Sequence, residues 1–318
     1  MSVKDLKPGK IRKQKNLSAL QDTMGDKIFG AVNIILLLII TFVLLYPIYF
    51  IVIASLSDPF DVVNGRVFLW IKNFTLESYG YVIKQSNLWT GYRNTIINTV
   101  CTVAYQLVLL VPAAYVLSKK NLAGRKFFNW FFVITMFFGG GMVPTYLMYK
   151  DFGLLNTRWS LILSAVGTYN MIVTRTYFQN SIPQELYEAA HIDGASEFSC
   201  FFRIALPLSG AIVSVIALFV ASGSWNSYYN AMLYIRTQKL YPLQLVLRDT
   251  LITAQNAYLS IDPNSADEDA FAQALRLNYL AESMKYSVIF VASFPMLALY
   301  PFVQRFFVKG VMIGAVKG

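Results

Sequence analysis

The residues whose types and spacing could do chemistry gather in a short polar segment between two long apolar ones. The segment reads Glu188-Ala189-Ala190-His191-Ile192-Asp193-Gly194, and Ile204-Ala205-Leu206-Pro207 follows it. Glutamates near a helix start and two small alanines suit the binding of another protein. The small alanine side chains let a groove of another protein close over the helix backbone, while basic residues of that partner pair with the carboxylates. The segment therefore indicates recognition between proteins.

Acid–base and metal chemistry have few candidates elsewhere in the chain. His191 is the only histidine, and the apolar segments hold neither a carboxylate pair nor a cluster with metal-ligand spacing. These observations argue against an enzyme. They also argue against a transporter coupled to protons or sodium, because such coupling usually needs carboxylates within the membrane.

Capping and turn preferences predict the element that positions the segment. Ser181 can cap a helix start, Gln184 three residues on completes a capping box, and Pro183 is tolerated in the first turn. Helical spacing then places one set of side chains on a common face: Ile182, Leu186, Ala189, Ala190 and Asp193.

Gly194 suits a left-handed helix stop, because glycine has no Cβ to clash there. The chain can then turn sharply into a second short helix at Ser196–Phe202, and Pro207 fits the first turn of the apolar segment that follows. An ordinary hairpin between two membrane spans also uses serine, proline and glycine, so the residues alone leave this alternative open.

Composition places the whole chain in a membrane, since 56% of the residues are hydrophobic and only 14% are charged. Six segments are almost free of charge, and most exceed the roughly 20 residues that a membrane-spanning helix needs. They are Phe29–Ser57, Thr95–Ser118, Phe127–Tyr149, Ser160–Val173, Ile204–Ile235 and Tyr286–Val303. We therefore expect an all-α membrane protein with six transmembrane helices, of which the fourth spans only with its flanking residues.

Lysine and arginine set the expected orientation. They concentrate in the short segments that share a side with the N-terminus, next to the first three spans. The positive-inside bias then places the N-terminus and the loop 181–207 in the cytoplasm of a multi-pass plasma-membrane protein. The net charge of +10 would also suit a nucleic-acid binder. Basic residues beside membrane spans are better explained by anionic lipid, so we expect no nucleic-acid partner.

Three parts follow from these patterns: a basic cytoplasmic N-terminal tail at 1–28, a six-helix transmembrane domain at 29–308, and a cytoplasmic C-terminal tail at 309–318. Within the domain, Gly139-Gly140-Gly141 followed by Pro144 predicts either close helix packing or a flexing point in the third span. Cys101 and Cys200 are expected to stay unpaired.

Two long segments are expected outside the cell membrane. Asp58–Trp89 is too apolar for a free linker, so we expect it to fold back on the membrane surface or to pack on a neighbouring subunit. Arg236–Lys285 is the longest outer segment, and its polar stretch Asp262–Asp269 either contacts an external partner or forms a solvated loop.

Polar and aromatic residues late in the fifth span, with a second group in the fourth, are candidates for a solute path. Flat aromatic faces together with amides and hydroxyls are the mixture that holds a sugar. An aromatic belt at the membrane surface would explain some of the same residues. Arg175 either faces a water-filled cavity or lies at the inner surface. The candidate path residues are Tyr169, Asn170, Trp225, Asn226, Tyr229 and Asn230.

The spacing of Glu188, the two alanines, Gly194, Ile204, Leu206 and Pro207 resembles the EAA loop of permease subunits of binding-protein-dependent ABC importers. Further stretches resemble the sugar-permease branch that contains the maltose permease subunits, and within it the subgroup for complex oligosaccharides of alginate and pectin type. These stretches are Tyr115–Lys120, Gly124–Phe128, Pro144–Leu147, Arg175–Thr176 and Leu240–Leu245. The terminal Gly314–Gly318 resembles a tail that in some members reaches between the ATPases.

The resemblance implies a type I importer fold and a docking role for the loop. The residues that would couple to a separate ATPase are Glu188, Ala189, Ala190, Asp193, Gly194, Ile204, Leu206 and Pro207. It also implies a second related permease, two ATPase subunits that bind ATP and magnesium, and an extracellular or periplasmic solute-binding protein that delivers an oligosaccharide. The chain itself would carry no catalytic residue, metal or cofactor. A permease of the same superfamily for a non-sugar solute is the alternative.

Overall fold

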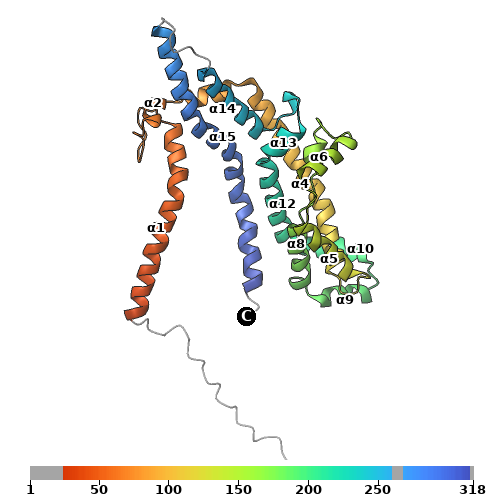
Figure 1. The fold of residues 1–318 in the computed structure, drawn as a ribbon. Coiled ribbons are helices and arrows are strands. Elements are labelled where there is room, and N and C mark those ends of the chain that lie inside the picture. Colours follow the sequence, from red (N-terminus) through yellow and green to blue (C-terminus); the bar gives the residue numbers. More distant parts are fainter. Residues whose placement is uncertain (1–23, 260–267, 316–318) are drawn as a thin grey trace, which may run out of the picture. The chain divides into compact units, whose positions relative to one another are not determined.

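The computed structural model describes residues 24–259 and 268–315, and every element in these ranges is helical (Figure 1). The elements are α1 Met24–Ser55, α2 Pro59–Val63, α3 Glu77–Lys84, α4 Ser86–Ser118, α5 Arg125–Phe137, α6 Met142–Asp151, α7 Trp159–Ile162, α8 Thr168–Asn180, α9 Gln184–Ile192, α10 Glu197–Cys200, η2 Phe201–Ala205, α11 Leu206–Leu208, α12 Gly210–Trp225, α13 Tyr228–Tyr234, η3 Gln238–Leu240, α14 Leu243–Leu259 and α15 Glu268–Ala315. The all-α prediction is confirmed for the described residues.

Parts of three predicted segments lie outside the described residues. They are 1–23 of the N-terminal tail, 262–267 of the polar stretch and 316–318 of the C-terminal tail. The helix α15 continues to Ala315, beyond the predicted end of the transmembrane domain at residue 308.

Residues up to Phe50 form one unit, and residues from Ile51 form another. Most of α1 belongs to the first unit, and its 32 residues are long and apolar enough to cross a membrane. The rings of Phe42, Tyr46 and Phe50 follow one another along it at centroid distances of 6.5 and 6.2 Å. Nearly all of its side chains point outward, which suits contact with lipid.

Three helices of the described chain pass the length and composition test for a membrane span: α1, α4 and the stretch Leu275–Pro301 of α15. Two bent pairs would raise the number to five. α5 and α6 meet at 110°, and Glu197–Leu208 meets α12 at 75°. The fourth predicted span is divided between α7 and α8. The count of six therefore stays a prediction.

The 110° bend falls on the three glycines that the sequence marks. α5 ends at Phe137, Gly141 has a φ of 83°, and α6 begins at Met142. Glycine adopts this left-handed conformation without strain. No atom of the described chain lies within 4 Å of where a Cβ on Gly139 or Gly141 would stand, so these two residues do not serve close packing between helices of this chain. The glycines end one helix and redirect the chain into the next.

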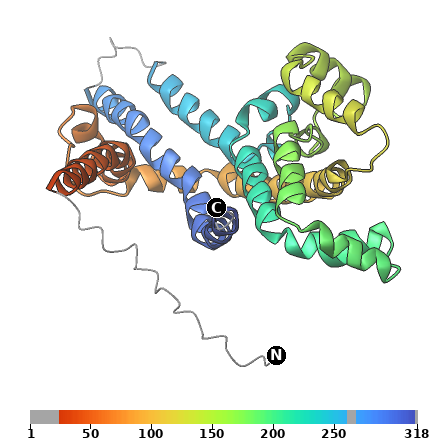
Figure 2. The same ribbon diagram turned by 90° about the horizontal axis from the view of Figure 1, so that it is seen from below.

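The first hydrophobic core joins the C-terminal half of α4 to α8, α12 and the loop 181–207. Leu110, Ala114, Ile216 and Cys200 are almost completely buried in it. Figures 1 and 2 show α4, α8 and α12 side by side, and Figure 1 places α9 and α10 at one end of them. The loop is therefore anchored by the same core that holds the helices together.

A second hydrophobic core joins α3, the start of α4, the end of α12, α14 and α15. It buries Leu88, Trp225, Leu243 and Met284. The predicted outer segment Arg236–Lys285 is therefore mostly helical, since α14 and the first part of α15 lie within it.

The other outer segment, Asp58–Trp89, packs on the chain's own α15 through α2 and α3. The Phe60 ring meets the Tyr279 ring edge-on at 5.3 Å. The hydroxyls of Ser78 and Ser283 lie 3.0 Å apart. The prediction that this segment is no free linker is confirmed, but its partner is this same chain, where we expected the membrane surface or a neighbouring subunit.

Asn94 of α4 fastens two connections of the chain to the helix, and its side chain is fully buried. Its Oδ1 accepts a hydrogen bond from the Arg158 guanidinium at 2.7 Å. Its Nδ2 donates to the carbonyls of Lys239 and Tyr241 at 2.8 and 2.9 Å. One amide thus ties the connection before α7 and the connection before α14 to the start of α4.

Replacing Asn94 with alanine should destabilise the protein, because the Arg158 guanidinium and two carbonyls lose their partner. We expect a cost of about 3 kcal/mol, read as a lower unfolding temperature of the purified protein. Asn87 lies exposed on the same helix, and Asn87→Ala is the matched control. Equal unfolding temperatures for Asn94→Ala and wild type would contradict this account.

Candidate functional site

The loop between α8 and α12 is built from short helices, and its first turn differs from the sequence prediction. α9 begins at Gln184 with Pro183 at the N-cap position, and no side chain caps it. Ser181 instead ends the preceding helix, where its backbone amide donates to the Tyr177 carbonyl at 2.8 Å. The predicted capping box is therefore wrong, because Ser181 belongs to the end of α8.

The end of α9 has the predicted geometry. Gly194 has a φ of 76°. Its amide donates to the His191 carbonyl at 3.0 Å, and the next amide, of Ala195, donates to the Ala190 carbonyl at 2.8 Å. This pair of bonds is the Schellman arrangement that satisfies the last carbonyls of a helix. The left-handed stop at Gly194 is therefore confirmed.

The predicted common face of α9 is wrong in part. Tyr187 and Ile182 are buried in the first core, and Ala190 packs against that core. Ala189 and Asp193 are exposed. Because Tyr187 anchors the helix, the residues one turn after it face the body of the protein. The outward side of α9 consists instead of Glu188, Ala189, Ile192 and Asp193, with Leu186 also exposed.

α10 continues the loop after the Gly194 stop, close to the predicted helix Ser196–Phe202. Ser196 caps it by accepting a hydrogen bond from the Ser199 amide at 3.3 Å. One π-helical turn, η2, leads on into α11, which holds Pro207 in its first turn. Ile204 and Leu206 of this stretch pack against the first core.

Three large apolar side chains of the loop point outward. Ile192 is 87% exposed, Phe198 is 77% exposed, and Phe202 is 57% exposed. The rings of Phe198 and Phe202 stack at 6.5 Å. Large apolar side chains that cluster on an exposed surface favour contact with another protein or with lipid. We call these three residues the apolar loop surface.

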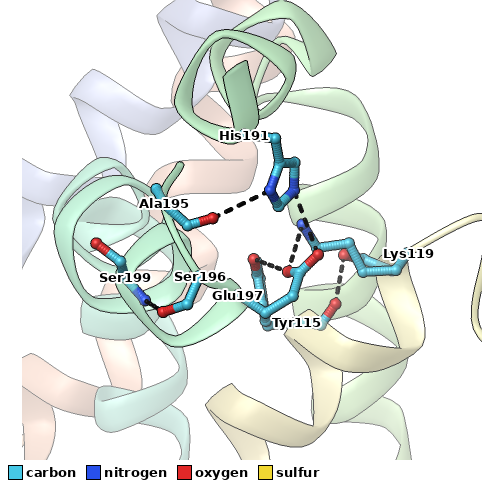
Figure 3. A network of polar contacts seen from close by, with 8 residues as sticks. Tyr115, Lys119, His191, Ala195, Ser196, Glu197 and Ser199 are labelled. Atoms are coloured by element: carbon cyan, nitrogen blue, oxygen red, sulfur yellow. Dashed lines mark hydrogen bonds and ion pairs between the residues drawn. The ribbon is translucent and has the colours of Figure 1, made fainter. Parts of the chain in front are cut away.

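In the same loop, the carboxylate of Glu197 joins three elements (Figure 3). Its Oε2 accepts from the Tyr115 hydroxyl at 3.0 Å and lies 3.2 Å from the Lys119 ammonium. Its Oε1 lies 3.3 Å from Nε2 of His191. Tyr115 and Lys119 lie at the end of α4, His191 on α9 and Glu197 on α10. We call these four residues the Glu197 clamp.

Electrostatics keep the Glu197 carboxyl ionised. Burial disfavours the charge, but hydrogen bonds from Lys119 and Tyr115 and the charges of Lys119 and His191 outweigh it and lower the pKa of Glu197. The Lys119 ammonium also lies 3.9 Å from the centre of the Tyr187 ring. Burial, with contributions from Cys200 and Glu197, raises the pKa of Tyr187 to about 12. The arrangement can hold α9 and α10 to α4.

A polar cavity lies between α4, α8, α12 and the connection 163–167. It has a volume of about 240 Å³. Two of the six candidate path residues, Asn170 and Asn230, line it. The lining is Thr95, Asn98, Thr102, Gln106, Leu161, Ser164, Ala165, Gly167, Asn170, Val220, Gly223, Ser224, Ser227, Asn230 and Pro242.

The other four candidate path residues lie elsewhere. Trp225 is buried in the second core and donates its indole N–H to the Ala292 carbonyl at 3.0 Å, so it is no belt residue at a membrane surface. Trp225 and Asn226 line a separate and mostly apolar recess against α15. The Tyr229 hydroxyl bonds the Met142 sulfur, and Tyr169 is 60% exposed.

Arg175 is held on α8 by the Asn129 side-chain oxygen, which accepts a hydrogen bond from its guanidinium. It does not line the polar cavity. The polar cavity therefore gives no support to the expectation that Arg175 faces a water-filled cavity.

Sequence reasoning missed the wall of the cavity that α4 provides. Thr95, Asn98, Thr102 and Gln106 recur at intervals of three and four residues, which puts them on one face of a helix. Polar side chains in such a register within an apolar span were the available signal, because a membrane helix rarely carries them toward lipid.

Comparisons with known proteins agree with this architecture. Residues 88–313 match the family described as the binding-protein-dependent transport system inner membrane component. Protein LplC of Bacillus subtilis is 36% identical over 95% of this chain and 99% of its own length. The polygalacturonan/rhamnogalacturonan transport system permease protein YtcP of Bacillus subtilis is 33% identical over 93% of this chain and 100% of its own.

A solved structure extends the likeness to the fold. One chain in the crystal structure of a bacterial ABC transporter, which is involved in the import of the acidic polysaccharide alginate, superposes with a TM-score of 0.76. It is 34% identical, and the match covers 90% of this chain and 98% of the other. The chain therefore belongs to the family of inner-membrane components of binding-protein-dependent transport systems, as a non-enzymatic permease subunit of an ABC importer with the type I fold.

Proposed function

We propose that this chain forms half of the path by which an ATP-driven importer takes up an oligosaccharide, with its N-terminus and the loop 181–207 in the cytoplasm. The loop docks on a separate ATPase, which binds the ATP and magnesium. The observation that carries the docking proposal is the exposed apolar loop surface, Ile192, Phe198 and Phe202, backed by the Glu197 clamp. The site residues for coupling remain Glu188, Ala189, Ala190, Asp193, Gly194, Ile204, Leu206 and Pro207.

The clamp gives the coupling a physical route. A push on α9 or α10 reaches α4 through the bonds of Glu197 to Tyr115 and Lys119. The same helix α4 supplies Asn98, Thr102 and Gln106 to the polar cavity. Closure of the ATPase subunits would therefore bias α4 between two arrangements of the path, which is how a bound partner shifts a two-state unit.

The proposed substrate and partners follow from the family and its relatives. YtcP is named for polygalacturonan and rhamnogalacturonan, and the solved transporter is described for alginate. We propose an oligosaccharide of this pectin or alginate type, delivered by an extracellular or periplasmic solute-binding protein. A second related permease completes the path, two ATPase subunits drive it, and lipid surrounds the six spans.

Gly194→Val should uncouple solute uptake from ATP hydrolysis. A β-branched residue disfavours the left-handed conformation at the end of α9, and this conformation sets the direction of α10. No atom lies within 4 Å of the Cβ position at Gly194, so the variant suffers backbone strain of about 1–2 kcal/mol without a clash. With the reconstituted importer and an oligogalacturonide as probe, we expect loss of uptake and of binding-protein-stimulated ATP hydrolysis.

Gly153→Val is the matched control. Gly153 has a φ of 66° and equally open space at its Cβ position, but it follows α6 far from the loop in sequence. The control should lose similar stability and keep uptake. If both variants transport like wild type, the coupling role of Gly194 is refuted. If the wild-type complex takes up no acidic or neutral oligosaccharide at all, the proposed function itself fails.

Engineered cysteines at Ala189 and Ile192 should crosslink to a cysteine in the groove of the ATPase subunit, because both side chains are exposed. Ala190→Cys is the neighbouring control and should crosslink weakly, since Ala190 packs against the first core. Native Cys101 is exposed and would be replaced with serine, whereas Cys200 is buried and can remain. Absence of a crosslink from both exposed positions would exclude docking on this side of α9.

Removing the charge of Glu197 should weaken coupling. Glu197→Gln is expected to reduce binding-protein-stimulated uptake by roughly 2- to 30-fold, the range for a residue that transmits coupling between sites. Glu282→Gln is the control, because it breaks an ion pair with Lys285 on the surface of α15. Uptake equal to wild type in Glu197→Gln would show that the clamp transmits nothing.

The pH dependence of the clamp has a definite sign. Because the pKa of Glu197 is lowered in the folded protein, its stabilisation is present above the ordinary carboxyl pKa and is lost as pH falls through the lowered value. The difference in unfolding temperature between wild type and Glu197→Gln should therefore persist at neutral pH and shrink as the pH is lowered beyond the ordinary glutamate pKa of about 4.3. A difference that grew on acidification would contradict the assignment.

A further inference from the structure

Two arginines come together where α5 packs against α8. Arg175 of α8 donates a hydrogen bond from its guanidinium to the side-chain oxygen of Asn129 on α5. Asn129 lies one helical turn after Arg125, so Arg125 and Asn129 share the face of α5 that meets α8. The positive charge of Arg125 acts on Arg175 across this contact. Two like charges therefore lie near each other at the junction of the two helices.

The junction offers hydrogen-bond donors and no negative charge. A guanidinium carries five N–H donors and no acceptor, and Asn129 adds the two donors of its amide NH₂. Among the described residues, no carboxylate forms an ion pair with Arg125 or Arg175. Both arginines are partly exposed, so a ligand can reach them. A pair of cations beside a membrane is costly unless an anion offsets their charge, so this junction favours an anionic ligand.

The start of α5 adds to this preference. Arg125 is the first residue of the 13-residue helix, and Gly124 before it has a φ of 73° and provides no side-chain cap. The first amides of a helix lack partners within the helix and carry partial positive charge, which attracts phosphate groups. A phosphate at this position can therefore contact backbone amides and a guanidinium together.

The surroundings of the junction favour a lipid as the source of the phosphate. α5 has no buried residue, and its first two turns expose Phe127, Trp130 and Phe131. The rings of Phe127 and Phe131 stack at 6.4 Å. Since α5 and α6 together pass the test for one bent membrane span, the start of α5 lies where that span meets the membrane surface. A phospholipid there finds cationic groups for its phosphate and apolar side chains for its acyl chains.

We propose that Arg125, Arg175 and the start of α5 form a binding site for the phosphate of an anionic phospholipid. The phosphate lies at both guanidiniums and offsets their repulsion, because arginine matches the geometry of phosphate oxygens with paired N–H donors. A headgroup that carries its own cation, such as choline, brings a third positive charge to the site and binds less well. The site goes beyond the proposed function and does not depend on which solute is transported.

Lipid binding to the purified importer complex tests the site. The complex is stripped of lipid in detergent and offered equal amounts of phosphatidylglycerol and phosphatidylcholine, and the bound lipids are counted by native mass spectrometry. We expect wild type to retain phosphatidylglycerol in preference. The double variant Arg125→Gln with Arg175→Gln should bind phosphatidylglycerol roughly tenfold more weakly or worse, the loss expected when a charge-assisted hydrogen bond disappears.

Lys120→Gln with Arg203→Gln is the matched control. Both side chains are exposed and form no described ion pair, and the variant removes the same number of charges. Lys120 lies in the turn before α5 and Arg203 lies in η2, so neither belongs to the junction. This variant should keep the wild-type preference for phosphatidylglycerol. The unfolding temperature in phosphatidylcholine alone shows whether each variant is folded.

The conservative variant Arg125→Lys with Arg175→Lys keeps both charges and removes the planar donor groups. It should bind phosphatidylglycerol less tightly than wild type and more tightly than the glutamine variant, because a lysine ammonium attracts phosphate without the paired N–H geometry. If the glutamine variant does not assemble, the comparison of this lysine variant with wild type carries the test, and equal binding by the two refutes the site.

Glycerophosphoglycerol, which is phosphatidylglycerol without its acyl chains, separates a lipid site from a site for a soluble phosphate ester. It should displace little phosphatidylglycerol at equal concentration, because it lacks the apolar contacts with α5. Displacement as effective as that by the lipid itself would overturn the lipid assignment. So would a wild-type complex without preference for phosphatidylglycerol, or an equal loss in the arginine variant and its matched control. None of these measurements involves solute uptake, so each outcome leaves the proposed function untouched.

Discussion

The fold depends on helix α4 being fixed at both ends while its middle remains polar. At one end the Asn94 amide ties it to the connections before α7 and α14. At the other end the Glu197 carboxylate ties it to α9 and α10. Between these attachments lie the cavity residues Asn98 and Thr102.

Much of the loop could be predicted from the sequence, because its turns depend on local backbone chemistry. The left-handed stop at Gly194 needs only the missing Cβ, and Ser196 begins a helix as serine usually does. The capping box at Ser181 failed for a tertiary reason. Ser181 ends α8, and the neighbouring Ile182 is drawn into the first core, which leaves Pro183 at the helix start.

The cavity and the Glu197 clamp were harder to predict, since both depend on residues distant in sequence. Glu197 and Tyr115 are 82 residues apart, and hydropathy treats the α4 span as one apolar segment. Trp225 shows the same difficulty. Its amphipathic ring suits a membrane surface or a sugar site, and only the packing of α15 places it in a core. Asn170 and Asn230, which share amide chemistry with the cavity wall, do line the cavity.

The bond between Thr95 and Leu243 restricts how the cavity can change shape. The Thr95 hydroxyl accepts from the Leu243 amide at 2.7 Å, and Thr95 and Pro242 both belong to the lining. Together with the bonds of Asn94, this makes the start of α4 and the chain at 239–243 a single rigid wall. Any change in the shape of the cavity must therefore come from α8 or α12 moving relative to this wall.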